Sequence, residues 1–127
     1  MYNIIIYNKN NKQKHTIKCV PYANTFKKRL IGLIGKNNFN GLIFKQKYSN
    51  RINASIHTCF MKQPIDIIYI NHEMQIKEIT TLKPWKIYIP KKGYIEYIIE
   101  LPEKSIIKNK LKIGDKVVMQ YAKKKNW

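Results

Sequence analysis

The residues with the most available chemistry are His57, Cys59 and Met61, which alternate along the segment 55–61. This segment is rich in β-branched and aromatic residues, so we expect a β-strand, on which alternate side chains share one face. An imidazole, a thiol and a thioether would then stand in a row, and Cu(I) prefers such ligands. Because a buried cysteine and methionine more often serve packing, we expect no resident metal or other cofactor and keep this site as the alternative.

Asp66 is the second residue with possible chemistry, because its carboxylate begins a strand that is otherwise apolar. Burying a carboxylate without a partner is costly. The partners open to it are a backbone amide of the turn 62–64, Arg29 or His57. If Asp66 contacts His57, the two could act as an acid–base pair or activate Cys59. A structural ion pair or a turn cap is the favoured interpretation, so we do not expect an enzyme.

Arg29 is one of only two arginines in a chain that otherwise uses lysine for its cations. The planar guanidinium binds a carboxylate or phosphate through two parallel hydrogen bonds, which lysine cannot do. We therefore expect Arg29 to contact a carboxylate or an anionic ligand. The carboxylates open to it are those of Asp66, Glu100 and Asp115.

Trp85 follows Pro84 in a short segment, 85–89, that prolines bracket on both sides. Proline cannot donate to a sheet ladder, so this segment is predicted as an edge strand or a loop clasp. The indole is expected to be a hydrophobic plug, with a pocket wall as the alternative. Taken together, the candidate residues predict a ligand-binding cleft near Arg29, His57, Asp66 and Trp85.

Short segments of β-branched and aromatic residues, separated by Asn, Gly or Pro, recur along the chain. This pattern predicts a mainly β fold, either a jelly-roll-like sandwich or a partly open barrel. The strands beside residues 62–64 are expected to pair around that turn, which would leave His57 nearer Tyr69 than Asp66. The expected strands are 2–7, 15–20, 42–44, 55–61, 65–70, 74–80, 94–101 and 116–121.

One short helix is expected at about residues 24–34, where the apolar residues follow a helical spacing. Asn24 or Thr25 would serve as the N-cap and Gly35 as the stop. A helical turn is also expected near residues 102–108, where a proline precedes an acidic residue.

Six short motifs are specific in combination, although each is weak alone. They are Arg29-x-x-Gly32-Leu33, Gly41-Leu42-Ile43-Phe44, His57-Thr58-x-Phe60-Met61-x-x-Pro64-Ile65-Asp66, Pro84-Trp85, Glu100-Leu101-Pro102 and Gly114-Asp115. Over residues 20–118 the chain thereby resembles the domain of unknown function family number 192. The resemblance implies a mainly β domain with one packed helix and no settled activity. The residues expected to have structural roles are Gly32, Gly41, Pro64, Gly114 and Asp115.

The chain departs from the pattern of the resembled family in three places. Ile34 and Leu42 stand where methionines are typical, which conserves apolar volume. Cys59 stands where an aromatic residue is commoner. After Pro102, Glu103-Lys104 replaces a small residue followed by glycine, which puts the geometry of that turn in question.

The charge balance is strongly positive, with 25 Lys plus Arg against 7 Asp plus Glu. Such an excess binds polyanions through counterion release, so we expect nonspecific adhesion to polyanions at low salt. The lysines are spread along the chain, apart from residues 123–125, and Ile, Asn and Tyr are also abundant, which indicates a compositional bias. A nonspecific nucleic-acid-associated role is therefore kept as an alternative.

The length of 127 residues predicts one domain, 1–127, with a frayed basic tail at 122–127. Cys19 and Cys59 make no disulfide framework. No run approaches a signal-peptide core or a membrane span, so we expect a cytoplasmic protein. The sequence therefore predicts a binding or interaction module for an unknown small ligand or protein, with an enzyme using His57 and Asp66 as the alternative.

Overall fold

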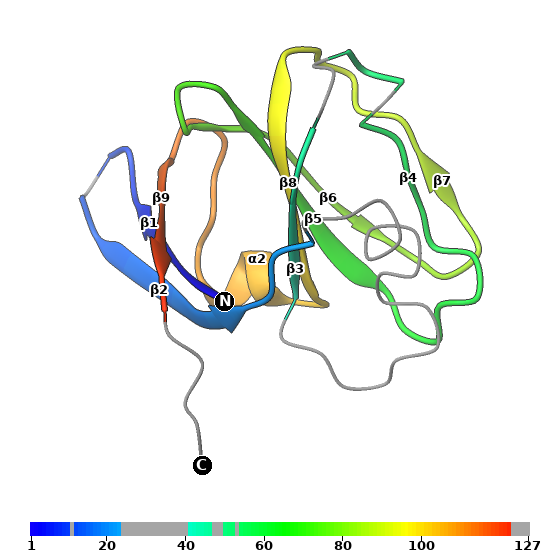
Figure 1. The fold of residues 1–127 in the computed structure, drawn as a ribbon, viewed down its shortest axis with the longest axis horizontal. Helices are drawn as coiled ribbons and strands as arrows, with labels where there is room; N and C mark the ends of the chain where they lie inside the picture. The colour runs from blue at the N-terminus through cyan, green and yellow to red at the C-terminus, as the bar shows by residue number, and fades with distance from the viewer. Residues whose placement is uncertain (11, 24–40, 47–49, 53, 123–127) are drawn as a thin grey trace.

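The computed structural model describes residues 1–10, 12–23, 41–46, 50–52 and 54–122. Within these residues the chain forms three antiparallel sheets and one short helix, and no sheet closes into a barrel (Figure 1). The prediction of a mainly β fold is confirmed, while its finer description as a jelly roll stays a prediction. The helix expected at about residues 24–34, with Arg29 and Gly32, lies outside the described residues.

The strands form two larger sheets and a separate two-stranded ribbon. The three-stranded sheet has the order β2 (Lys14–Val20), β1 (Tyr2–Tyr7) and β9 (Lys116–Tyr121). The four-stranded sheet has the order β3 (Leu42–Lys45), β8 (Ile95–Pro102), β5 (Ile65–Asn71) and β6 (Ile76–Leu82). The ribbon pairs β4 (Ile56–His57) with β7 (Ile87–Tyr88), and the helix α2 (Ser105–Lys108) lies between β8 and β9 in the chain.

Strand β5 separates two hydrophobic cores. It lies between β8 and β6, and all of its residues are buried. Ile65, Ile67 and Tyr69 pack with residues of β3, β8 and β4 in the ribbon-side core. Ile68 and Ile70 point to the opposite face and pack with residues of β1 and β9 in the β1-side core. Side-chain alternation along one strand therefore holds both cores together.

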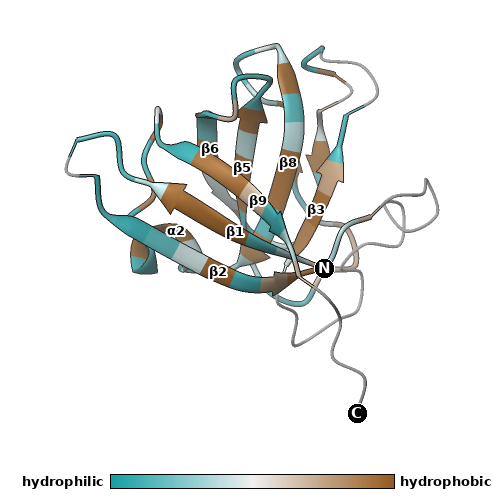
Figure 2. Cartoon of the chain, turned by 60° about the vertical axis from the view of Figure 1, so that its left-hand side comes forward, coloured by the Kyte–Doolittle hydropathy of each residue, from teal (hydrophilic) through white to brown (hydrophobic). Residues whose placement is uncertain are grey.

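The hydropathy of a strand follows its position within its sheet. In Figure 2 hydrophobic residues run along β1 and along the strands of the four-stranded sheet, whereas much of β2 and the connecting turns are hydrophilic. Strand β2 lies at the edge of its sheet, and Lys14, Thr16 and Lys18 are exposed on it. Charged side chains on an edge strand oppose pairing with another chain.

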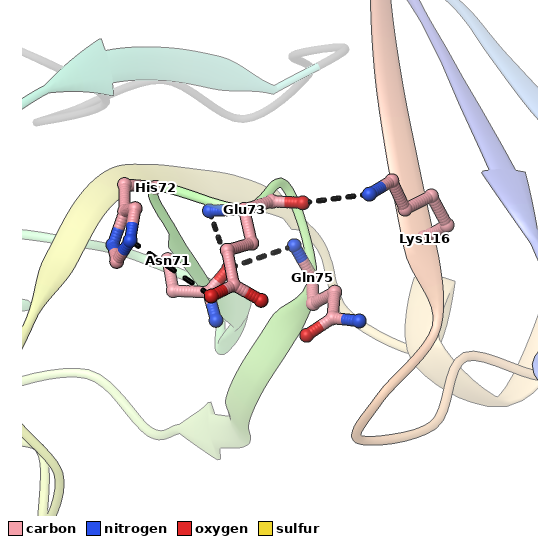
Figure 3. A network of polar contacts seen from close by, with 5 residues as sticks. All are labelled: Asn71, His72, Glu73, Gln75 and Lys116. Carbon is pink, nitrogen blue, oxygen red and sulfur yellow. Dashed lines mark hydrogen bonds and ion pairs between the residues drawn. The ribbon is translucent and has the colours of Figure 1, made fainter.

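The turn between β5 and β6 joins the two larger sheets (Figure 3). Asn71 Oδ1 accepts hydrogen bonds from the backbone amides of Glu73 (3.0 Å) and Gln75 (2.9 Å). Lys116 Nζ of β9 donates to the Glu73 carbonyl at 2.9 Å, and Gln75 forms an antiparallel bridge with Lys116. Strand β6 begins at Ile76, two residues later than predicted, because Asn71 holds the intervening residues in a turn.

Strand β4 is shorter than the strand predicted at residues 55–61, and its partner differs. It ends at His57, which pairs with Ile87 of β7. Phe60 then adopts a left-handed backbone with φ 66°, which ends the extended conformation. The predicted hairpin between this segment and β5 is therefore wrong, because β4 pairs instead with the proline-bracketed segment that we expected to be an edge strand or clasp.

Gly41 and Gly114 occupy positions where chain segments approach closely or reverse. Gly41 has φ +130°, and a Cβ there would lie 2.6 Å from the carbonyl oxygen of Glu100. Gly114 has φ +96° in the turn before β9. In the same turn the Asp115 carboxylate accepts hydrogen bonds from the backbone N–H of Lys9 (3.0 Å) and from an amide three residues earlier (2.9 Å). These contacts tie the start of β9 to the β1–β2 hairpin.

The turn after β8 keeps a geometry suited to glycine although it contains none. Lys104 lies immediately before α2 and has a left-handed backbone with φ 73°. The resemblance implies glycine at this position, and a left-handed backbone is the conformation that glycine adopts without steric cost. Among the described residues, no helix is long and apolar enough to cross a membrane.

We expect Lys104→Gly to raise the free energy of unfolding by about 1 kcal/mol, because glycine adopts a left-handed backbone without steric cost. Lys108→Gly in α2 is the matched control and should lower it by about 1 kcal/mol, since glycine weakens a helix. Urea unfolding of both variants measures the difference. A loss of stability in Lys104→Gly would contradict the assignment.

Candidate functional site

Thr58 fastens the end of the β4–β7 ribbon through both its side chain and its backbone. The side chain is buried, and Oγ1 donates to the carbonyl of Lys83 (2.6 Å) and accepts from the N–H of Lys86 (2.9 Å). The Thr58 N–H donates to the Lys86 carbonyl at 2.9 Å, and the Thr58 carbonyl accepts from the N–H of Trp85 at 3.0 Å. Residues 83–86 are thereby held against the end of β4.

Phe60 and Trp85 form an exposed aromatic pair at this end of the ribbon. They are 63% and 61% exposed, and their ring centroids lie 4.7 Å apart with the planes inclined at 57°. Both backbones are left-handed, with φ 66° and 61°, which is rare for large residues. The prediction of Trp85 as a hydrophobic plug is therefore wrong. The hydrogen bond to Thr58 holds its backbone in a turn, and its indole lies on the surface.

The outward face of the ribbon is apolar. Ile87 is 70% exposed and lies opposite the exposed His57, and Ile89, two residues further on, is 44% exposed. Ile56 and Tyr88, which alternate with them, pack on the ribbon-side core. We use the term ribbon face for the exposed set His57, Phe60, Trp85, Ile87 and Ile89.

Exposed hydrophobic residues concentrate in and beside the ribbon. Of the twelve large hydrophobic residues exposed in the described part of the chain, six lie between residues 52 and 60 or between 85 and 94. They are Ile52, Phe60, Trp85, Ile87, Ile89 and Tyr94. Single exposed apolar residues need no explanation, but a contiguous group of them marks an interaction surface.

The chain segments that carry the ribbon face contain exposed cations and no carboxylates. Lys62, Lys83 and Lys86 are exposed in the segments that carry the aromatic pair, and two further exposed lysines follow Ile89. The segments 41–65 and 79–95 contain no Asp or Glu. The ribbon face therefore combines apolar side chains with charge of a single sign.

Glu78 of β6 lies beneath the ribbon and is buried. Its carboxylate accepts hydrogen bonds from the Tyr88 hydroxyl and from the N–H groups of Lys91 (2.9 Å) and Lys92 (3.2 Å). Burial, with the hydrogen bond and negative charge of Glu78, raises the pKa of Tyr88 to about 12. Burial also raises the pKa of Tyr69, whose ring centroid lies 6.1 Å from that of Tyr88. Glu78 thus joins the ribbon to the four-stranded sheet.

Asp66, a candidate catalytic residue, is engaged in structural contacts. Its carboxylate is buried and accepts hydrogen bonds from Thr81 Oγ1 (2.7 Å) and from the N–H of Ile106 in α2 (2.8 Å). The adjacent Ile65 and Ile67 face the ribbon-side core, so alternation directs Asp66 to the opposite side of the sheet. The structure therefore does not bring Asp66 to the ribbon face.

His57, Cys59 and Met61 do not share a face as predicted. His57 is exposed, Cys59 is half-buried and Met61 is buried in the ribbon-side core. The prediction that all three side chains lie on one face of a strand is wrong, because β4 ends at His57. Among the described residues, no group of three or more His, Cys, Asp or Glu could hold a metal ion. Of the predicted cleft residues, the ribbon face contains His57 and Trp85.

Thr58 is a key residue that sequence reasoning missed. Its signal was present, since a threonine buried in an apolar surrounding needs a hydrogen-bond partner. The partner carbonyl belongs to Lys83, 25 positions further along the chain. Nothing in the local pattern indicated that these two segments meet.

The buried carboxylates make the surface more positive than the composition suggests. Four of the seven acidic residues are buried, at positions 66, 78, 100 and 115. Those at 66, 78 and 115 accept hydrogen bonds from backbone amides. Only three of the seven acidic side chains, those at 73, 96 and 103, therefore lie outside the interior.

Comparison with protein families gives a match over nearly the whole chain. The model of the DUF192 family, described as "Uncharacterized ACR", matches residues 6–119. The chain belongs to the DUF192 family. The UPF0127 protein of Pyrococcus abyssi is 41% identical over 98 residues, which are 77% of this chain and 83% of the relative. That of Pyrococcus horikoshii is 43% identical over 98 residues, with 77% and 84% covered.

Two solved structures share the fold of this DUF192 protein. A Sinorhizobium meliloti protein, provisionally named a transcription regulator, has a TM-score of 0.81 at 16% identity, covering 93% of this chain and 92% of that chain. A Novosphingobium aromaticivorans protein of unknown function has a TM-score of 0.76 at 16% identity, covering 91% and 83%. At such identity the likeness concerns the fold alone.

We expect Asp66→Ala to lower the free energy of unfolding by about 2 kcal/mol, because the Thr81 hydroxyl and the Ile106 amide lose their acceptor. Glu103→Ala removes an exposed carboxylate and should change it by no more than about 0.5 kcal/mol. Chemical denaturation compares the two variants. Equal stability of both would show that the Asp66 contacts contribute nothing.

We expect stability to fall as the pH rises from 10 to about 12, because the raised pKa of Tyr88 means that the folded state holds this proton more tightly than the unfolded state. The contribution is complete below pH 10 and is lost across that interval. Tyr88→Phe should make the fall shallower, whereas Tyr94→Phe, at an exposed tyrosine, should not. Thermal unfolding midpoints across the alkaline range measure this, and parallel curves for both variants would refute it.

Proposed function

We propose that this DUF192 protein is a binding module that contacts an anionic partner through the ribbon face. The observation that carries the proposal is the group of exposed apolar side chains flanked by lysines, in segments that contain no carboxylate. An exposed apolar patch offers a contact surface, and charge of a single sign selects a partner of the opposite sign. A cytoplasmic location, as expected from the sequence, is part of the proposal.

The rigidity of the ribbon supports a binding role. Thr58 holds one end through four hydrogen bonds to residues 83–86, and Glu78 holds the other through Tyr88 and the two amides that follow. A surface that is ordered before binding loses less conformational entropy on contact. The left-handed backbones of Phe60 and Trp85 fit this role, because such conformations persist only where the surrounding structure enforces them.

The enzyme alternative receives less support than the binding role. Asp66 already accepts hydrogen bonds at both carboxylate oxygens, from Thr81 and Ile106. It also points away from the side of the sheet that carries the ribbon and His57. The proposal therefore retains His57 and Trp85 from the predicted cleft and assigns Asp66 to the scaffold.

Heparin chromatography of the full chain tests this proposal with two variants of equal charge. We expect Lys83→Ala/Lys86→Ala to elute at a clearly lower salt concentration than Lys14→Ala/Lys18→Ala, whose exposed lysines lie on β2. Removing cations beside the contact face should weaken binding more than removing cations elsewhere. Equal elution shifts in the two variants would mean that the whole surface binds polyanions without a preferred face, and would overturn the proposal.

A further inference from the structure

We propose that the anionic partner of the ribbon face is the surface of an anionic lipid membrane. This inference rests on the proposed function and names the class of partner for the same site. The residues that carry it are the exposed isoleucines, Ile87 and Ile89, the aromatic pair of Phe60 and Trp85, and the adjacent lysines.

The apolar part of the ribbon face matches the boundary between lipid headgroups and acyl chains. Ile87 is the most exposed member at 70%, and an aliphatic side chain gains from entering hydrocarbon. Trp85 combines a large apolar ring with one N–H donor, and tryptophan prefers this boundary for that reason. Aliphatic and indole groups together therefore fit a lipid surface better than a purely polar polyanion.

The charged part fits the same partner. Lys62, Lys83 and Lys86 are exposed beside the aromatic pair, and lysines near a membrane are attracted by its anionic headgroups within about 10 Å. The segments 41–65 and 79–95 contain no carboxylate that would oppose this attraction. Glu78, the acidic residue of β6 beneath the ribbon, is buried and hydrogen-bonded to Tyr88.

Two other occupants fit the ribbon face less well. A second copy of the chain would bring the same lysines together across a symmetric contact, and like charges repel. Single-stranded nucleic acid stacks its bases on aromatic rings, but Phe60 and Trp85 lie against one another with centroids 4.7 Å apart. Ile87 and Ile89 have no aromatic ring on which a base could stack.

The test uses the full chain with Trp127→Phe, so that Trp85 is the only tryptophan, and vesicles of phosphatidylcholine with or without phosphatidylglycerol. We expect co-sedimentation with the anionic vesicles at physiological salt and a blue shift of Trp85 emission, because the indole enters a less polar environment. Neutral vesicles should give neither. Absence of both signals with anionic vesicles would overturn the lipid inference.

Matched isoleucine variants locate the contact. Ile87→Ser/Ile89→Ser should weaken binding to anionic vesicles about tenfold, whereas Ile107→Ser/Ile113→Ser, at two exposed isoleucines outside the ribbon, should leave it unchanged. Phe60→Ser is an additional single-site variant for which we also expect weaker binding, and circular dichroism verifies that each variant is folded. An equal loss in both double variants would overturn the inference.

A parallel titration with a single-stranded oligonucleotide separates this inference from the proposed function. Binding of the oligonucleotide that depends on Phe60 and Trp85, without vesicle binding, would leave the proposed function in place and overturn the lipid partner. If the ribbon-face variants change neither vesicle nor oligonucleotide binding, both proposals fail. Vesicle binding that the Ile87→Ser/Ile89→Ser variant weakens about tenfold supports both.

Discussion

Buried carboxylates that accept hydrogen bonds from backbone N–H groups hold the loops of this protein in place. Asp66 accepts a hydrogen bond from a backbone N–H of α2, and Glu78 accepts hydrogen bonds from the N–H groups of Lys91 and Lys92. Asp115 accepts hydrogen bonds that join the turn before β9 to the β1–β2 hairpin. A buried charge is stable only when such partners surround it. The chain has few acidic residues, so using most of them internally also leaves the surface strongly basic. The burial of these carboxylates therefore holds the loops and also leaves fewer acidic side chains at the surface.

The ribbon depends on this arrangement and on one hydroxyl group. Glu78 binds the inward side of β7 through Tyr88, while Thr58 gathers residues 83–86 against the end of β4. Between these two attachments the ribbon has apolar side chains on its inward face and on its outward face. Ile56 and Tyr88 contribute to the ribbon-side core, while Ile87 and Trp85 stay exposed. A two-stranded ribbon is marginal by itself, so its order comes from the sheet beneath it.

The predictions held where local pattern and tertiary contacts agree. Strands β1 and β9 match their expected ranges because their alternation follows a sheet with one buried face. Strand β4 did not, because Phe60 leaves the extended conformation to satisfy contacts with a segment that is distant in the chain. Lys104 is a second case, in which a lysine adopts a left-handed backbone that suits glycine. Local preference lost to tertiary structure at both positions.

The sequence by itself determined the β-rich class, the family, the turn at Gly114 and the excess of positive charge, since composition, periodicity and motif spacing encode these directly. Tertiary structure alone decided which strands pair and where each polar side chain points. Asp66 was recognisable as a carboxylate in need of a partner, but its partners, Thr81 and α2, meet it only across the sheet. The indole of Trp85 was expected to be buried but is exposed, because a hydrogen bond to the Thr58 carbonyl holds the Trp85 backbone in a turn. Contacts between residues far apart in the chain depend on how the sheets assemble, and local spacing carries no record of that.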